Sequence, residues 1–190
     1  MPQLRSCAVD VAPLRAEPSN DAEQVTQALR GEPLSVEEVR GEWARVRTAY
    51  DYPGWVRVEA LGGEPDPAWL PAARDGSAVE EARAFLGTPY VWGGLTERGI
   101  DCSGLVHIAF RRLGKLVPRD ADQQEAGGAV VAEPDTGDLI TYGDEAADHI
   151  AFWLGNGRIL HATAREGVNA VVEENEPESY RERRRLFIRL

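Results

Sequence analysis

A stretch rich in proline and glycine, residues 62–77 (GGEPDPAWLPAARDGS), divides the chain into two parts with different hydrophobic patterns. Proline and glycine interrupt both helices and strands, so this stretch is predicted to be a linker. Before it, apolar residues alternate in short runs. After it, helical patterns come first and strand patterns follow. We therefore expect a first domain over residues 1–61 and a second over residues 78–190.

The first part reads as a small all-β domain. Residues 4–61 hold several short β-rich runs, separated by Gly31 and Gly41 and by the Pro53-Gly54 pair. Short strands with regular turn signals are typical of a small barrel or sandwich. Cys7 lies in the first of these runs, where a small buried thiol is the expected state.

The second part reads as an α+β domain. Residues 78–87 (AVEEARAFLG) and 102–114 (CSGLVHIAFRRLG) have helical apolar spacing, and each ends in glycine. Strand patterns follow in GDLITYG, DHIAFWLGNG, RILHATA, VNAVVEE and RLFIRL. The Asn156-Gly157 pair between the second and third of these predicts a hairpin turn. Helices followed by strands favour an α+β fold.

Charge and hydropathy exclude several classes of function. The formal net charge of −11 argues against a nucleic-acid partner, which needs a basic surface. The basic run RERRRLFIRL at residues 181–190 ends in an alternating strand pattern and is expected to be a solvated approach to a strand. No apolar run approaches the roughly 20 residues that span a bilayer, and the first residues do not resemble a signal peptide. We therefore expect a cytoplasmic protein without a membrane partner.

Cys102 is the candidate nucleophile. It lies at the predicted start of a helix, after Asp101 and before Ser103, both of which are good capping residues. Unpaired N–H groups and the helix dipole at such a position favour a thiolate and lower the thiol pKa. Gly104 in the first turn would let another segment approach closely. The local sequence is equally compatible with a buried helical cysteine.

The three histidines favour a catalytic function. His107 is on the same predicted helix as Cys102 but points to another side of it, as a packing residue would. His149 and His161 lie on either side of the predicted turn, at positions that would pair if the hairpin closes near residues 156–157. One imidazole would then take the thiol proton while the other orients it. Two alternatives remain: a zinc site formed by Cys102, His149 and His161, and two histidines that are only structural.

Motifs across residues 78–190 resemble the NlpC family of papain-like cysteine peptidases, which cleave bacterial cell-wall peptides. TPYVWGG, DCSGLV, PRDADQQ, PDTGDLITYG and DHIAFWLGNGRILHA occur in the order typical of that family. The resemblance implies that Cys102 is the nucleophile, His149 the general base and His161 the residue that orients the base. It also implies that the hydroxyl of Tyr90 helps to stabilise the oxyanion, and it implies no cofactor or metal.

Residues 4–61 resemble a bacterial SH3-like module, through PLRAEPS, VTQALRGE and YDYPGW. This module followed by the peptidase is similar to cytosolic γ-D-glutamyl-L-diamino acid endopeptidases, which recycle murein tripeptides or tetrapeptides that have a free N-terminal L-Ala. The resemblance implies that Tyr52, Ser103 and Asp120 bind the substrate's ammonium. Some relatives have a glutamate where this chain has Val25, and Glu23 or Glu32 is the alternative.

The sequence therefore predicts a papain-like NlpC catalytic domain preceded by a small SH3-like barrel. We expect a cysteine endopeptidase of cell-wall recycling with Cys102, His149, His161 and Tyr90 as its catalytic residues. Two alternatives stay open at this point. One is an exported hydrolase that acts on intact peptidoglycan, and the other is a catalytically inactive protein that binds wall peptides.

Overall fold

The computed structural model describes residues 3–190, so residues 1 and 2 of the expected first domain lie outside the described part. The chain folds as two compact units, with the division between residues 72 and 73. Residues 62–77, all of them described, contain no helix or strand. None of the helices formed by residues 3–190 has the length and apolar character needed to cross a bilayer.

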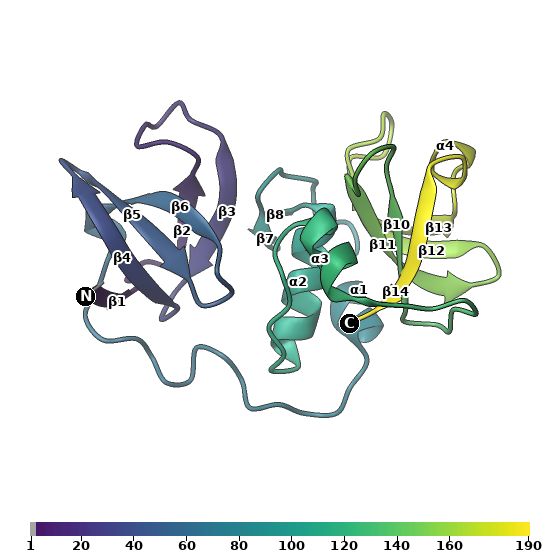
Figure 1. The fold of residues 1–190 in the computed structure, drawn as a ribbon, viewed down its shortest axis with the longest axis horizontal. Helices are drawn as coiled ribbons and strands as arrows, with labels where there is room; N and C mark the ends of the chain where they lie inside the picture. Colours follow the sequence, from purple (N-terminus) through teal and green to yellow (C-terminus); the bar gives the residue numbers. More distant parts are fainter. Residues whose placement is uncertain (1–2) are drawn as a thin grey trace. The chain divides into compact units, whose positions relative to one another are not determined.

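The first unit is a six-stranded antiparallel sheet (Figure 1). Its strand order is β1-β4-β5-β6-β2-β3, and the sheet encloses a small core that includes Leu14, Leu34, Val46 and the thiol of Cys7. The expected burial of Cys7 is therefore confirmed. The elements are β1 (Gln3–Ser6), β2 (Val11–Arg15), β3 (Gln24–Leu29), β4 (Pro33–Arg40), β5 (Trp43–Thr48), β6 (Pro53–Arg57) and the 3-10 helix η1 (Val58–Ala60).

Glycines close two of the three turns predicted for this unit, whereas the predicted Pro53-Gly54 turn is wrong, because both residues lie at the start of β6 and pair with β5. Gly31 and Gly41 have φ angles of 80° and 58°, in the left-handed region that side chains with a Cβ rarely adopt. Gly31 lies between β3 and β4, and Gly41 between β4 and β5. The predicted all-β character of residues 4–61 is confirmed.

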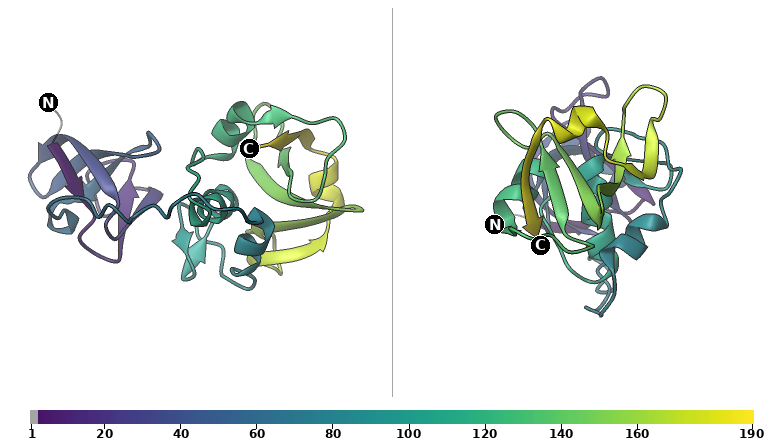
Figure 2. Two further views of the ribbon diagram at one scale, coloured as in Figure 1. Left: turned by 90° about the horizontal axis from the view of Figure 1, so that it is seen from below. Right: turned by 90° about the vertical axis from the view of Figure 1, so that its right-hand side faces the viewer.

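The second unit packs helices against a six-stranded sheet. The helices are α1 (Ala78–Arg83), α2 (Cys102–Arg112), α3 (Ala121–Gly127) and α4 (Glu178–Arg181). The sheet has the order β13-β12-β11-β10-β14-β9, and Figure 2 shows it strongly curved. Its strands are β9 (Ala129–Val130), β10 (Leu139–Tyr142), β11 (His149–Gly155), β12 (Arg158–Thr163), β13 (Ala170–Asn175) and β14 (Arg184–Arg189), and a separate pair is β7 (Leu95–Thr96) with β8 (Gly99–Ile100).

Helix α2 lies against β11 and β12, the two strands that carry His149 and His161. The predicted α+β class is confirmed, as are the predicted strands from residue 139 onward. Helix α1 ends earlier than its glycine predicted, at Arg83 instead of near Gly87. Helices α3 and α4 were not predicted, because each is short and mostly polar.

The predicted hairpin forms, but in a different register. Asn156 and Gly157 have φ angles of 52° and 72°, as a tight Asn-Gly turn requires. Phe152 pairs with Leu160 and Trp153 with Ile159, with a shift in register near Gly155. Relative to the pairing that would place His149 directly opposite His161, β12 is shifted along β11 by two residues. They are diagonal neighbours instead, a separation that aromatic side chains can bridge.

Intramolecular carboxylates bind the arginines of the basic run at residues 181–190. Arg183 pairs with Asp144 and Asp148, and Arg185 with Glu125. Arg184 and Arg181 both pair with the buried carboxylate of Glu176, and Arg189 pairs with Asp135 and Asp138. The run is therefore part of β14 and its approach, as the alternating pattern predicts.

Candidate active site

Cys102 is the first residue of α2, as the sequence predicts. Asp101 caps this helix: its Oδ1 accepts the backbone N–H of Gly104 at 2.7 Å. The absence of a side chain at Gly104 lets the chain approach closely, because a Cβ there would lie 2.4 Å from the carbonyl oxygen of Gly94. The nucleophile candidate is thus held at a helix start against the preceding loop.

The carboxylate of Asp101 joins three segments around this helix start. Besides capping α2, it accepts the backbone N–H of Gly93 at 2.7 Å. Arg119 donates to both of its oxygens, at 2.9 and 2.7 Å, and both side chains are almost fully buried. Two opposite charges taken out of water require this complete set of hydrogen bonds. Asp101 therefore ties the loop before α2, the helix itself and the segment before α3 into one rigid support.

The environment of the thiol differs from the sequence expectation. Burial, followed by the negative charge of Asp101, raises the pKa of Cys102 to about 12. The backbone N–H groups of Ile150 and Ser103 act in the opposite direction, because they stabilise the thiolate. The expected lowering at a helix start is outweighed by desolvation. The contact with Ile150 also places the thiol beside the residue that follows His149.

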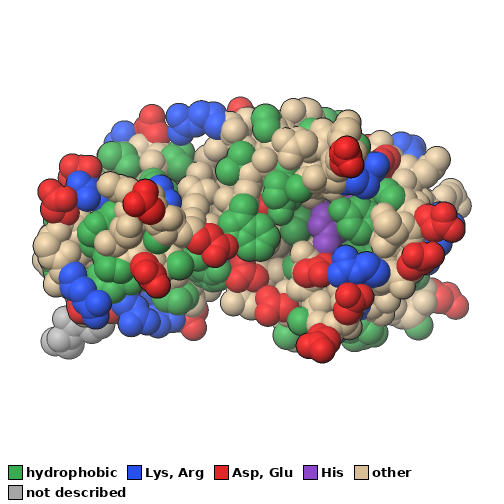
Figure 3. Space-filling model, turned by 90° about the horizontal axis from the view of Figure 1, so that it is seen from above, with side chains coloured by type: hydrophobic (Ala, Val, Ile, Leu, Met, Phe, Trp, Pro, Cys, Tyr) green, Lys and Arg blue, Asp and Glu red, His purple; other side chains and the backbone are tan. Residues whose placement is uncertain are grey.

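The two histidines form a direct hydrogen bond. Nε2 of His149 lies 2.8 Å from Nδ1 of His161, and both rings are buried. His149 keeps 7 % of its surface exposed, whereas His107 and His161 keep none, so the histidine surface visible in Figure 3 is that of His149. Burial lowers the pKa of both His149 and His161. Both imidazoles are therefore neutral near pH 7, as a proton acceptor and its partner must be.

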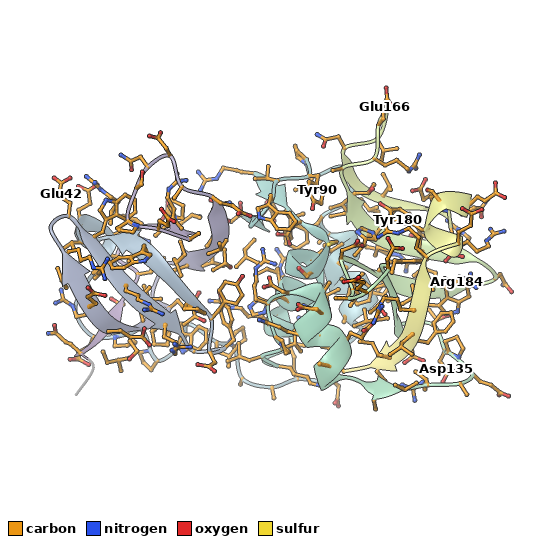
Figure 4. All side chains as sticks on the ribbon, turned by 45° about the horizontal axis from the view of Figure 1, so that its top comes forward. Glu42, Tyr90, Asp135, Glu166, Tyr180 and Arg184 are labelled. Atoms are coloured by element: carbon orange, nitrogen blue, oxygen red, sulfur yellow. The ribbon has the colours of Figure 1, made fainter. Side chains whose placement is uncertain are left out.

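Three neighbours of the histidine pair were missed by the sequence analysis. Nε2 of His161 lies 3.1 Å from Oε1 of Glu174, which in turn accepts two hydrogen bonds from Arg165. Tyr180 stacks on His149 with ring centroids 4.5 Å apart and planes inclined by 5°. Figure 4 shows Tyr180 over the strands of the second unit. Alternation along β13 could have placed Glu174 on one face, but only the pairing of β12 with β13 brings it to His161.

Tyr90 lies in the loop before α2, half-buried, with its N–H bound to the carbonyl of Asn169. Burial raises the pKa of its phenol, and the neighbouring Cys102 and Asp101 raise it further. The hydroxyl is therefore protonated and close enough to Cys102 to feel its charge. A neutral hydroxyl of this kind can donate to a developing oxyanion.

His107 has the structural role predicted for it. The ring is fully buried, and its Nδ1 lies 2.8 Å from the carbonyl oxygen of Val117. A carbonyl only accepts, so Nδ1 carries the proton. Burial, with the charges of Arg119 and Arg111, lowers its pKa to about 3.

The residues expected to bind an ammonium are divided between the two units. Tyr52, in the first unit, is half-buried and its ring centroid lies 6.4 Å from that of Tyr50. In the second unit the hydroxyl of Ser103 is buried and accepts from Arg119 at 3.0 Å. Asp120 is the N-cap residue of α3, in a capping box with Gln123. These local contacts give Ser103 and Asp120 structural roles, and their binding of an ammonium stays a prediction.

The two alternative carboxylates differ in exposure. Glu32 is fully buried in the first unit, where Oε2 accepts the N–H of Leu29 at 3.2 Å, while Glu23 is exposed.

The histidine geometry does not suit the zinc alternative. Both ring nitrogens of His161 are used by His149 and Glu174, so the histidines face each other and not a common point. Across residues 3–190, no group of three or more His, Cys, Asp or Glu side chains is arranged to hold a metal ion. The arrangement instead matches a thiol with a neutral base and a partner that orients the base.

Comparison with known proteins identifies both parts of the chain. Residues 14–61 match the model of the bacterial dipeptidyl-peptidase Sh3 domain. A probable endopeptidase of Corynebacterium glutamicum (strain R) is 39 % identical over 108 residues, which cover 55 % of this chain and 50 % of the relative. A gamma-D-glutamyl-L-lysine dipeptidyl-peptidase of Bacillus cereus is 33 % identical over 113 residues, covering 56 % of this chain and 33 % of the relative. The chain thus spans half or less of the length of these curated relatives.

Solved structures show the same fold. An NlpC/P60 family protein from Bacillus cereus aligns with 98 % of this chain and 62 % of its own, with a TM-score of 0.58 and 23 % identity. The peptidoglycan hydrolase RipB from Mycobacterium tuberculosis aligns with 59 % of this chain and 62 % of its own, with a TM-score of 0.52 and 31 % identity. Residues 87–186, more than half of the chain, match the model of the NlpC/P60 family, and the protein belongs to that family.

Proposed function

We propose that this protein is a cysteine endopeptidase that cleaves the γ-D-glutamyl-L-diamino acid bond of cell-wall peptides with a free N-terminal L-Ala. The observation that carries the proposal is the hydrogen-bonded pair His149–His161, together with the thiol of Cys102 at the backbone N–H of Ile150, the residue that follows His149. The substrate class is supported by the match to the dipeptidyl-peptidase Sh3 domain. Two relatives named gamma-D-glutamyl-L-lysine dipeptidyl-peptidase also support it.

The reaction uses the residues in the following way. His149 takes the proton of Cys102 as the sulfur attacks the γ-glutamyl carbonyl, and it then gives this proton to the leaving amine. His161 holds the ring of His149 through their hydrogen bond. The hydroxyl of Tyr90 and the backbone N–H of Cys102 stabilise the oxyanion. Water then releases the acyl-enzyme, with His149 as the base.

The free amine explains where such an enzyme would act. In intact wall peptides the L-Ala amine is linked to the sugar, so a site that pairs an ammonium rejects them because its buried polar groups stay unpaired. Only released tripeptides or tetrapeptides carry the ammonium. A cytoplasmic role in recycling these peptides is therefore part of this proposal.

Synthetic L-Ala-γ-D-Glu-L-diamino acid tripeptides, with a free or an acetylated N-terminus, test the proposal. We expect the free peptide to yield L-Ala-D-Glu and the diamino acid, and the acetylated peptide to resist cleavage. Cys102→Ala should abolish turnover while the circular dichroism spectrum stays unchanged. Cys7→Ala, which removes the other thiol from the core of the first unit, is the matched control and should retain activity.

Two results would contradict the proposal. Equal turnover of both peptides would instead favour a hydrolase of intact peptidoglycan. A relative named peptidoglycan endopeptidase RipB is 39 % identical over 117 residues. No turnover together with no labelling of Cys102 by iodoacetamide would favour a protein that only binds wall peptides.

A further inference from the structure

A continuous chain of hydrogen bonds runs outward from the catalytic base to a surface ion pair. His149 on β11 contacts His161 on β12 at 2.8 Å, and His161 contacts Glu174 on β13 at 3.1 Å. Arg165, in the loop after β12, donates to both oxygens of Glu174 at 2.8 and 2.6 Å. Three neighbouring strands thus place three side chains in hydrogen-bond contact one after another, and Arg165 holds the last of these, Glu174.

The protonation of this chain follows from its last acceptor. Burial raises the pKa of Glu174, but the hydrogen bonds of Arg165 and His161 outweigh it, so the net pKa is lowered and the group is a carboxylate. A carboxylate only accepts, so Nε2 of His161 carries the proton. In the neutral ring Nδ1 is then an acceptor, and the proton between the two rings must belong to Nε2 of His149. The remaining nitrogen of His149, Nδ1, is left without a proton.

We infer that Glu174, held by Arg165, is a positioning residue that sets the tautomers of His161 and His149 and leaves Nδ1 of His149 as the base. This inference rests on the proposed function for the roles of Cys102 and His149, whereas the tautomers of the two histidines follow from the hydrogen bonds alone. When Cys102 gives its proton to Nδ1, His149 becomes an imidazolium and keeps its Nε2–H bond to His161. The negative Glu174 at the far end then favours the new positive charge.

Among the groups around His161, Glu174 is the one whose hydrogen bond fixes the tautomer of the ring. His149 can donate or accept, depending on its own protonation. Tyr180 meets His161 edge to face, with ring centroids 5.4 Å apart, and its hydroxyl is bound to Thr163 at 2.8 Å. Arg165 faces Glu174 and not the ring. Only the carboxylate imposes a direction on the proton.

Glu173 provides a matched control on the same strand. Its carboxylate pairs with Arg83 at 3.1 Å and with Arg158 at 3.0 Å, and it does not contact His161. Glu173→Leu therefore removes a partly exposed carboxylate and its ion pairs from β13 without touching the histidine chain. An effect seen in both Glu174→Leu and Glu173→Leu would therefore come from disturbing β13 and not from the loss of the contact with His161.

Kinetics of three variants give the first test. We expect Glu174→Leu to lower kcat by roughly 10- to 100-fold with little change in KM, by analogy with the loss of the carboxylate that orients a metal-binding histidine. Glu174→Gln, whose amide oxygen can still accept from Nε2 of His161, should stay within a few-fold of wild type. Alkylation of Cys102 by iodoacetamide should follow the same order, and it needs no peptide. Wild-type rates in Glu174→Leu, or equal losses in Glu173→Leu, would overturn the inference.

Histidine ¹⁵N NMR gives a second test that needs no substrate, and its wild-type measurement needs no variant. In the wild-type protein we expect the proton on Nε2 in His149 and His161 but on Nδ1 in His107, which serves as the internal reference. Glu174→Leu should shift His161 toward the Nδ1–H form, and Glu174→Gln should not. A proton on Nδ1 of His161 in the wild type would overturn the inference. Failure of peptide cleavage alone, with the expected tautomers and alkylation rates, would contradict only the proposed substrate.

Discussion

At the scale of single residues, burial has more influence on this site than local sequence. Cys102 begins a helix, a position that stabilises a thiolate, yet its desolvation raises the pKa to about 12. His149 responds in the opposite sense, because burial lowers the pKa of a base. Both effects favour a neutral thiol beside a neutral imidazole in the free enzyme. In the proposed reaction the thiol proton would therefore move during the attack, so it matters which ring nitrogen of His149 is free to accept it.

His107 permits a prediction about stability and pH. Its folded-state pKa of about 3 lies below the ordinary 6.5, so between these values the unfolded chain binds a proton that the folded chain does not. Stability is therefore lost as the pH falls from 6.5 toward 3. Between about pH 7 and pH 5 His107 alone should lower the free energy of unfolding by about 2 kcal/mol.

The prediction is checked by urea unfolding of the wild type and His107→Asn at the two pH values. The asparagine keeps an N–H donor for the carbonyl of Val117 but does not titrate. We expect the wild type to lose about 2 kcal/mol more than the variant. An equal loss in both proteins would show that His107 is not the titrating group.

At the scale of elements, the site depends on the junction at Asp101. A single buried carboxylate accepts from the loop before α2, from the first turn of α2 and from Arg119 ahead of α3. The short helix α3 and the loop have little stability of their own, since isolated helices of this length do not form in water. Their positions are set by this ion pair and by Gln124, which donates to the backbone oxygen of Ser103 at 3.0 Å.

Arg119→Met tests the junction. It leaves Asp101 buried without its counter-charge, so we expect the free energy of unfolding to fall by about 3–5 kcal/mol. Arg112→Met is the control, because the partly exposed Arg112 pairs with Glu97 and Glu81 at the surface, while methionine can still pack on the ring of Phe85, and the loss should cost about 1 kcal/mol or less. Urea unfolding measures both. Similar losses in the two variants would contradict a special role for the buried pair.

At the scale of the whole molecule, two units with separate cores form one chain. The first holds its own apolar core, and the second holds the thiol and the histidine pair. The residues proposed to bind a free amine are Tyr52 of the first unit and Ser103 and Asp120 of the second. The proposed nucleophile and base are both residues of the second unit.

Tyr52→Phe tests the role proposed for this residue of the first unit. If the hydroxyl of Tyr52 binds the substrate's ammonium, its loss should raise KM for the free tripeptide roughly tenfold, since hydrogen bonds to charged groups are worth more than neutral ones. The rate of Cys102 alkylation should not change. Tyr50→Phe, which removes a hydroxyl within 3.5 Å of Thr26 and of the carbonyl of Gln27, is the control. Unchanged KM in Tyr52→Phe would remove Tyr52 from the proposed site.

The features predicted correctly from the sequence are local ones. The start of α2 at Cys102 with Asp101 as its cap, the Asn156-Gly157 turn and the close approach at Gly104 each depend on a few consecutive residues. The α+β class follows from the period of the apolar residues in the same way. Such features survive in any fold because backbone geometry and capping act within a turn or two of chain.

Only the tertiary structure decided the contacts between residues that lie far apart in the chain. The hairpin register, the burial that reverses the expected pKa of Cys102, the Asp101–Arg119 pair and the contact of Glu174 with His161 all depend on how strands and helices pack. A glutamate 13 residues after a histidine has no sequence pattern that marks it as a partner. It becomes one because the register in which β12 pairs with β13 places the two side chains next to each other. We infer that the carboxylate thereby fixes the position of the proton on His161 and, through His161, on His149.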